Sequence, residues 1–157
     1  MNSVKSMKLR LNEIREKHDL SQRKTAIKLG ISKSYYNYFE SGERIIPLPR
    51  LNDFCNLFHV DFDYALGLTN NNIITKELKV LDKKLIGARI KEIRKINKLT
   101  QSALAKLLHT SQSTISSYES GNTIILTAFL YEMCIKLHVS MNYIVGKTNT
   151  IKTIIKP

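Results

Sequence analysis

The chain has 157 residues and a net charge of +12, from 25 Lys and Arg against 13 Asp and Glu. This length suits one domain or two small ones, and such a basic balance favours a polyanionic partner, nucleic acid before an anionic membrane. No window approaches the roughly eighteen apolar residues of a membrane span, and no apolar core follows the first methionine, so we expect neither a membrane partner nor a secretory leader.

The chain contains an internal repeat. Residues 8–70 correspond to residues 87–149 at a constant offset of 79 residues with no gap. The run Glu-Ser-Gly at 40–42, for example, returns at 119–121. The repeat predicts a first domain at residues 1–70, a linker at 71–84, a second domain at 85–149 and a C-terminal tail at 150–157. A unit of about 65 residues buries only about 60% of its unfolded surface, so each copy should be marginally stable alone.

Apolar residues recur with a helical period throughout, which predicts an all-α fold with five helices in each copy. The first helix has one apolar face, at Met7, Leu11 and Ile14 and again at Ile86, Ile90 and Ile93. Ser21 and Thr100 are suitable N-caps for a second helix, because a hydroxyl can accept a bond from the free N–H groups there. This helix runs to Leu29 or Leu108, with a small alanine (Ala26, Ala105) on its inner face.

A short turn separates the second helix from a third. Gly30 can end the second helix in a left-handed conformation, and His109 takes the same place in the second copy. Ser32 and Ser111 then cap a third helix that ends at glycine. Its predicted core face carries Tyr36 and Phe39, or Ile115 and Tyr118.

Two more helices complete each copy. A fourth follows the loops at 43–49 and 122–127, with Cys55 and Cys134 in its apolar pattern and with His59 and His138 expected as left-handed caps. A fifth spans about residues 62–66 and 141–145. We interpret the cysteines as small buried core residues in a reducing cytosol, and we expect no disulfide and no metal site. Short β-like runs at 73–74 and 151–155 give no clear strand.

Two helices joined by a short turn, with a serine cap on the second, form a helix-turn-helix. Residues 99–121, LTQSALAKLLHTSQSTISSYESG, resemble the Cro/phage-repressor type helix-turn-helix (lambda-repressor-like) family, and residues 20–42 are similar though less typical. The resemblance implies that Gln22 and Gln101 bond a phosphate and brace the third helix. It also implies structural ion pairs, Arg15 with Glu40 and Arg94 with Glu119.

The exposed start of the third helix would read base edges in the major groove. Lysine can donate to guanine and glutamine can bond adenine bidentately. The candidate DNA-binding residues, with Gln22 and Gln101, are Lys33, Ser34, Asn37 and Tyr38 in the first copy and Gln112, Ser113, Thr114 and Ser117 in the second. Residues 85–157 carry a net +7 and residues 1–70 a net +3, so the second copy should supply more of the phosphate contact.

The resemblance implies a cytoplasmic, sequence-specific double-stranded DNA-binding transcriptional regulator, a repressor before an activator. No enzyme motif such as G-x-S-x-G, a P-loop or H-E-x-x-H occurs, so we expect neither enzyme activity nor a cofactor. The alternative is an interaction protein, such as an antitoxin, an anti-repressor or a phage-type inhibitor, with one DNA-binding and one protein-binding copy. The tyrosine-rich run at 35–38 would make the first copy the site of a homodimer or a protein partner.

The linker decides how two copies meet one duplex. Its 14 residues span at most about 46–50 Å when extended and about 21 Å if helical, and residues 76–84 could instead extend the first helix of the second copy. An intermediate length permits a covalent pseudo-dimer that reads two unlike half-sites, whereas a homodimer would prefer a palindrome. We expect the pseudo-dimer.

Overall fold

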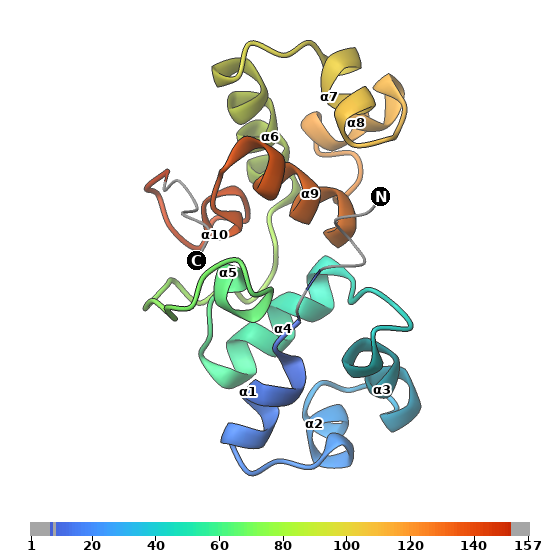
Figure 1. Ribbon diagram of the computed structural model, residues 1–157, viewed down its shortest axis with the longest axis vertical. Coiled ribbons are helices and arrows are strands. Elements are labelled where there is room, and N and C mark those ends of the chain that lie inside the picture. Colours follow the sequence, from blue (N-terminus) through green and yellow to red (C-terminus); the bar gives the residue numbers. More distant parts are fainter. Residues whose placement is uncertain (1–6, 8, 152–157) are drawn as a thin grey trace.

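The computed structural model describes residue 7 and residues 9–151, and this part of the chain contains ten α-helices and no β-strand. Five helices form a first half, namely α1 (Leu11–Lys17), α2 (Gln22–Lys28), α3 (Lys33–Ser41), α4 (Leu48–Phe58) and α5 (Phe62–Ala65). Five more form a second half, namely α6 (Lys83–Ile96), α7 (Gln101–Leu107), α8 (Gln112–Glu119), α9 (Thr127–Leu137) and α10 (Met141–Ile144). The halves lie end to end along the long axis of the molecule (Figure 1). The all-α prediction is confirmed.

The helix ends lie close to where the sequence predicts them. The hydroxyls of Ser21, Ser32, Thr100 and Ser111 each accept a hydrogen bond from the backbone N–H three residues on. His59 and His138 each cap the preceding helix in the left-handed conformation, at φ 53°. Gly30 and His109 take the same conformation in the turns, at φ 67° and 56°. These local bonds satisfy donors that a helix terminus leaves free.

The buried apolar residues of the two halves form one hydrophobic cluster. The predicted inward faces are buried, including Tyr36 and Phe39 of α3 and Ile115 and Tyr118 of α8. Cys55 and Cys134 are buried free thiols, and burial raises the pKa of Cys55 to about 12. The prediction of small core cysteines is therefore confirmed.

The first helix differs between the copies, and the prediction that Met7 belongs to it is wrong. Helix α1 begins only at Leu11, after a residue whose side chain forms no cap bond, whereas α6 begins at Lys83. The reason is Asp82, whose carboxylate accepts bonds from the N–H groups of Lys84 and Leu85 and so starts the longer helix.

The connecting segment, residues 71–82, has no helix, so the suggested extension of the first helix of the second copy back to residue 76 is wrong. The segment is also bonded to the protein. The side-chain oxygen of Asn72 accepts a bond from the Asp61 N–H at 2.9 Å, and the Asn52 amide donates to the Leu78 carbonyl at 2.9 Å. Further along, the Lys76 N–H donates to the Lys147 carbonyl at 3.1 Å. Helix α6 begins inside the stretch assigned to the linker, and the exact division of the chain at 70 and 85 stays a prediction.

The two halves pack through their last helices, α5 and α10, which lie beside each other in the middle of the molecule (Figure 1). The first N–H of α5, that of Phe62, donates to Asn142 Oδ1 at 2.8 Å. The first N–H of α10, that of Met141, donates to Asp63 Oδ1 at 2.7 Å. In the repeat Phe62 corresponds to Met141 and Asp63 to Asn142. Each half therefore caps the other with the same position, as in a two-fold symmetric dimer.

Further buried hydrogen bonds join the halves. Asn142 Nδ2 donates to Asp61 Oδ1 at 3.0 Å, and the Ser140 hydroxyl donates to Asp63 Oδ2 at 2.5 Å. The Thr127 hydroxyl at the start of α9 donates to the Ile46 carbonyl at 2.7 Å. Buried polar groups that lose a partner cost roughly 1–3 kcal/mol each, so this network holds the halves in one arrangement.

Burial at this contact should be measurable as a shifted titration. Burial raises the pKa of Asp63 to about 6, although bonds from Ser140 and Met141 oppose the rise. An unfolded aspartate titrates at about 3.9, so the folded state favours the protonated form. The contribution of Asp63 to stability is full below about pH 4 and is lost as the pH rises through about 6.

The measurement is a carboxyl ¹³C NMR titration of Asp63 in the full chain, with an expected midpoint near pH 6. Ser140→Ala removes one donor to the carboxylate and should move the midpoint upward. A midpoint for Asp63 below the ordinary aspartate value would contradict this account of the contact.

Candidate nucleic-acid interface

Each half presents a helix pair joined by a short turn, α2 with α3 and α7 with α8. The second helix of each pair starts at the serine cap predicted for it, and its inward face packs on the core. The outward face at its N-terminal end is left to solvent, with Lys33 and Ser34 exposed on α3 and Gln112 and Ser113 exposed on α8. A helix so held by its neighbours can enter a major groove with its first turn leading.

A buried ion pair holds the second helix pair in place. Arg94 of α6 meets Glu119 at the end of α8 with two bonds, Nε to Oε1 at 2.5 Å and Nη2 to Oε2 at 3.0 Å. Arg94 Nη1 also donates to the Leu99 carbonyl, which lies just before α7. The arginine therefore ties three elements together: α6, the start of α7 and the end of α8.

The first half repeats this arrangement. Arg15 Nε meets Glu40 Oε1 at 2.6 Å, and its Nη1 donates to the Leu20 carbonyl at 2.7 Å. Gln22 Nε2 donates to Glu40 Oε2 at 2.8 Å, as Gln101 Nε2 does to Glu119 Oε2 at 2.9 Å. The predicted ion pairs are thus present, and both glutamines bond the carboxylate that ends the following helix.

The carboxylates of these pairs stay ionised. Burial raises the pKa of Glu119, but the hydrogen bonds from Arg94 and Gln101 outweigh it and leave the pKa below its ordinary value. The pKa of Glu40 is lowered by the corresponding bonds from Arg15 and Gln22 against its own burial. Two charged groups bonded in this way keep a fixed geometry over the neutral pH range.

The candidate base-reading residues fall into two groups. Lys33, Ser34, Asn37, Gln112 and Ser113 are exposed and share the outward faces of α3 and α8. Thr114 and Ser117 are half-buried, and their hydroxyls bond Ser111 at 2.8 Å and Thr123 at 2.8 Å. The two groups therefore differ in exposure rather than in bonding, because the Ser113 hydroxyl also bonds Ser111, at 3.0 Å.

Two of the candidates are linked across the helix pair. Gln112 Nε2 donates to Gln101 Oε1 at 2.7 Å, and Gln101 in turn bonds Glu119. The chain of bonds runs from the buried ion pair to the exposed tip of α8. In the first half Gln22 Nε2 contacts Asn37 Oδ1 at 3.2 Å instead.

The tyrosine-rich run at 35–38 does not form one exposed cluster. Tyr36 is fully buried, and Tyr35 is half-buried with its ring edge-on to Phe39 at 4.6 Å between centroids. Tyr38 is half-buried beneath the Arg44 guanidinium, 4.7 Å from the ring centroid. Much of the aromatic surface that favoured a protein partner for the first copy is therefore used within the fold.

Cationic side chains mark the α2–α3 face. The exposed residues there include five positive charges, Arg23, Lys24, Lys28, Lys33 and Arg44. The second half has uncharged residues at all five corresponding positions, Ser102, Ala103, Leu107, Gln112 and Thr123. The sequence motif points to Lys33 alone. The other four stand out only when the two copies are compared position by position.

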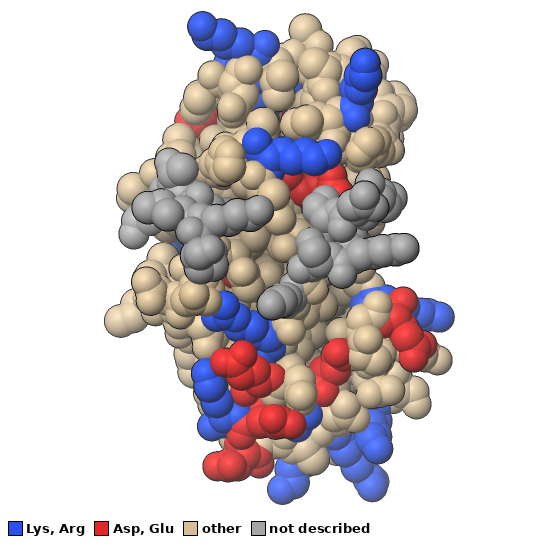
Figure 2. All heavy atoms as spheres, viewed as in Figure 1, with Lys and Arg blue, Asp and Glu red and all other residues tan. Residues whose placement is uncertain are grey.

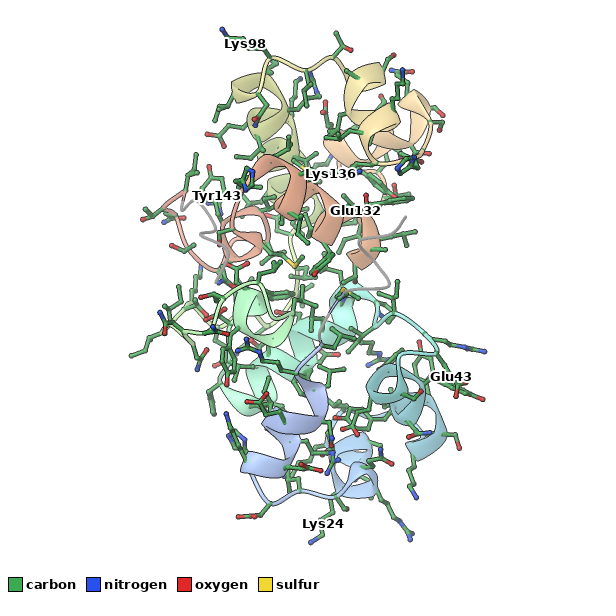
Figure 3. The ribbon with its side chains drawn as sticks, in the orientation of Figure 1. Lys24, Glu43, Lys98, Glu132, Lys136 and Tyr143 are labelled. Carbon is green, nitrogen blue, oxygen red and sulfur yellow. The ribbon has the colours of Figure 1, made fainter. Side chains whose placement is uncertain are left out.

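The positive charge of the second half lies elsewhere. On and just after α6 it includes Lys91, Lys95 and Lys98, whereas the corresponding positions 12, 16 and 19 of the first half are Asn, Glu and Asp. Acidic side chains gather over the α1 region in Figure 2, and Figure 3 shows Lys24 and Lys98 projecting from opposite ends of the molecule. Most of the larger net charge of the second copy therefore lies away from its helix-turn-helix pair, where α7 carries the exposed Lys106, and the expectation that this copy supplies more phosphate contact stays a prediction.

Other kinds of site find no support in the described residues. No group of three or more His, Cys, Asp and Glu within them could hold a metal ion. Across residues 7 and 9–151, no helix is long and apolar enough to cross a membrane.

Comparison with known proteins agrees with the geometry. The sequence model of the helix-turn-helix family matches residues 11–64 and again residues 90–144. The chain is 39% identical over 62 residues to the uncharacterized HTH-type transcriptional regulator YobD of Bacillus subtilis (strain 168), across 40% of this chain and 55% of that protein. It is 36% identical over 63 residues to the antitoxin PezA of Streptococcus pneumoniae serotype 4 (strain ATCC BAA-334 / TIGR4), across 40% of each protein.

Among solved structures, the P22 c2 repressor protein in complex with synthetic operator 9T is 31% identical, with a TM-score of 0.39, and the match covers 41% of this chain and 97% of the repressor chain. The matched segment spans about half the length of the two curated relatives or less. Because the family model covers more than half of the chain, in two separate matches, this protein belongs to the helix-turn-helix family of DNA-binding regulators and carries the domain twice.

Proposed function

We propose that this protein binds specific double-stranded DNA and represses transcription. The observation that carries the proposal is the pair of braced helices α3 and α8, whose first turns are free of the core and carry Lys33 and Gln112. Lysine suits guanine O6 and N7, and glutamine suits adenine N6 and N7. A repressor needs only to occupy its site, and helix-turn-helix domains are sufficient for that role.

The proposal is tested by electrophoretic mobility shift with the full chain and duplex fragments from its own genomic neighbourhood. One fragment should be retarded at a concentration at least about a thousandfold below that needed for random duplex. A transcription assay on that fragment should show reduced initiation. Equal affinity for every duplex would remove the proposal of sequence-specific binding.

We further propose that the α2–α3 face supplies much of the phosphate contact. A variant with Arg23→Ser, Lys24→Ala and Arg44→Thr carries the residues of the second copy at three cationic positions. The slope of log affinity against log salt should become shallower by about 0.9 for each phosphate that the variant no longer neutralises. The matched control is Lys91→Asn, Lys95→Gln and Lys98→Asn, which removes three charges from the α6 region. The proposal is wrong if the control changes the slope as much as the first variant does.

Individual residues should separate base reading from phosphate binding. Gln112→Ala should cost about 1–3 kcal/mol on the preferred site and relax selectivity at one base pair. Gln101→Ala should weaken binding to all duplexes more evenly, because this side chain lies at the start of α7, where the family resemblance implies a phosphate contact. Parallel titrations on preferred and random duplex measure both. If both substitutions affect the two duplexes equally, the assigned roles are wrong.

A second candidate function is an interaction protein with one DNA-binding and one protein-binding copy. The low charge of the α7–α8 pair favours it, because a pair whose exposed cation is Lys106 contributes less to phosphate binding than one with five cations. The matched antitoxin PezA is also consistent with it. Under this candidate Gln112→Ala leaves DNA affinity unchanged, which distinguishes it from the first.

A further inference from the structure

We propose that one chain, without a second copy, reads an asymmetric DNA element through both recognition helices at once, as a rigid covalent pseudo-dimer. This inference rests on the proposed function of duplex binding and adds the form of the partner: two unlike half-sites on one duplex face at a fixed spacing. The contact between the two halves carries it.

The contact is reciprocal between corresponding residues. The N–H of Phe62 is bonded by Asn142 and that of Met141 by Asp63, at 2.8 and 2.7 Å, and both pairs exchange roles under the repeat. The same holds for the side-chain bonds, since Asn142 meets Asp61 while Asp63 meets Ser140. Reciprocal contacts of this kind define a two-fold axis between the halves.

A two-fold axis places the two recognition helices equivalently. In Figure 1 α5 and α10 meet at the middle of one side, and α3 and α8 lie on the other side, one in each half. Dimeric helix-turn-helix proteins likewise present two recognition helices from either side of a two-fold axis to one duplex face, about one helical turn apart. Here a single chain supplies both.

The arrangement is rigid rather than tethered. Four residues of the interface are buried, namely Asp61, Phe62, Met141 and Asn142. Lys147 of the second half is also buried, and it donates to Asn56 Oδ1 at 3.3 Å across the contact. The connecting segment is bonded to both halves, since the Leu78 carbonyl accepts a bond from the Asn52 amide and the Lys76 N–H donates to the Lys147 carbonyl.

The contact also excludes the competing assembly. A homodimer built through α5 or α10 would need this self-complementary surface, and the chain's own other half already occupies it. The two recognition helices are chemically different. Helix α3 opens with Lys33 and Ser34, and Lys33 is one of five exposed cations on or beside α2 and α3. Helix α8 opens with the uncharged Gln112 and Ser113. The element should therefore be asymmetric, with a half-site that suits a lysine donor beside one that suits a glutamine.

Selection from a random duplex library with the full chain, followed by native mass spectrometry of the complex, tests the inference. The expected result is a non-palindromic element with two unlike half-sites about one turn apart, bound by one chain. A palindrome bound by two chains, or a single half-site that only one recognition helix protects, would overturn it. Failure to enrich any sequence would instead overturn the proposed function, so the two failures are distinguishable.

Half-site spacing separates a rigid pair from two tethered domains. With about 5 extra base pairs between the half-sites, half a turn, affinity should fall to that of the better half-site alone. With about 10 extra base pairs the half-sites return to one face but lie farther apart, and a rigid pair should not recover. Recovery of full affinity at the longer spacing would show a flexible tether and overturn the inference.

A charge placed in the contact gives an independent check. Asn142→Asp puts a third carboxylate beside Asp61 and Asp63, and should separate the halves without touching either DNA-facing surface. Affinity for the two-part element should fall by about tenfold or more, with affinity for an isolated half-site unchanged, because the two halves then bind without a fixed geometry. Asn71→Asp makes the same charge change at an exposed position and should have no such effect. Equal affinities of the two variants for the two-part element would overturn the inference. If Asn142→Asp does not fold, the spacing test on the unaltered chain decides the question instead.

Discussion

Replacing Arg94 with alanine is expected to lower the free energy of unfolding by about 3–5 kcal/mol, which is a large share of the stability of a small domain. The Arg94 and Glu119 side chains are only 10% and 3% exposed, and they share two hydrogen bonds. Without the arginine, the Glu119 carboxylate is buried with only the amide of Gln101 to bond it. Urea unfolding of the full chain, followed by circular dichroism, measures the loss.

A double-mutant cycle with Glu119→Ala isolates the pair. The double variant should be less destabilised than the sum of the two single variants, because removing both partners leaves no buried charge. The matched control is the exposed pair Lys17–Glu13, where Lys17→Ala should change the unfolding midpoint little. Strictly additive effects at Arg94 and Glu119 would show that the pair does not act as a unit.

The same pair has a predictable pH dependence. The pKa of Glu119 is below its ordinary value in the folded protein, so its contribution to stability is present above about pH 4.3, where an unfolded glutamate ionises. The contribution is lost as the pH falls through the folded pKa. The difference in stability between the unaltered chain and Arg94→Ala should therefore shrink in acid.

Gly87→Ala is expected to destabilise the second half by about 3 kcal/mol, near the upper end for an added methyl group in a packed interior. Gly87 lies in α6 where this helix crosses α8, and a Cβ at this position would stand 2.3 Å from the Tyr118 carbonyl oxygen and 2.7 Å from that of Glu119. Both neighbours are backbone, so no side-chain rotation relieves the overlap and α8 itself must move. The greater helix propensity of alanine, about 1 kcal/mol, offsets only part of this cost.

The substitution should also weaken specific DNA binding, since α8 is the proposed recognition helix. Thermal unfolding and titration of the preferred duplex measure the two effects. Ala88→Ser, at the exposed next position of α6, is the control and should stay within about 0.5 kcal/mol of the unaltered chain. Normal stability of Gly87→Ala would mean that the close approach of α6 and α8 does not exist in solution.

Local sequence was sufficient to predict the helices. The serine and threonine caps, the left-handed residues His59 and His138, and the glycine after α3 all act within a few residues of chain, so their effect is readable without a structure. The ion pair of Arg94 with Glu119 came from the family resemblance together with the repeat. The sequence placed the start of the first helix too early, because the apolar pattern extends back to Met7 although the helix itself begins at Leu11.

The sequence by itself determined the two five-helix units and the family, because periodicity, caps and turn residues repeat in register over the whole length of each copy. Only the tertiary structure decided how the units meet. The Phe62 N–H donates to Asn142 and the Met141 N–H donates to Asp63, and these partners are 80 and 78 positions apart in the sequence. Nothing local to either residue indicates its partner. The sequence also shows which elements carry the cations of each copy, but only the structure shows which of these side chains are exposed. Net charge sums over a segment, whereas binding depends on which face carries the charge.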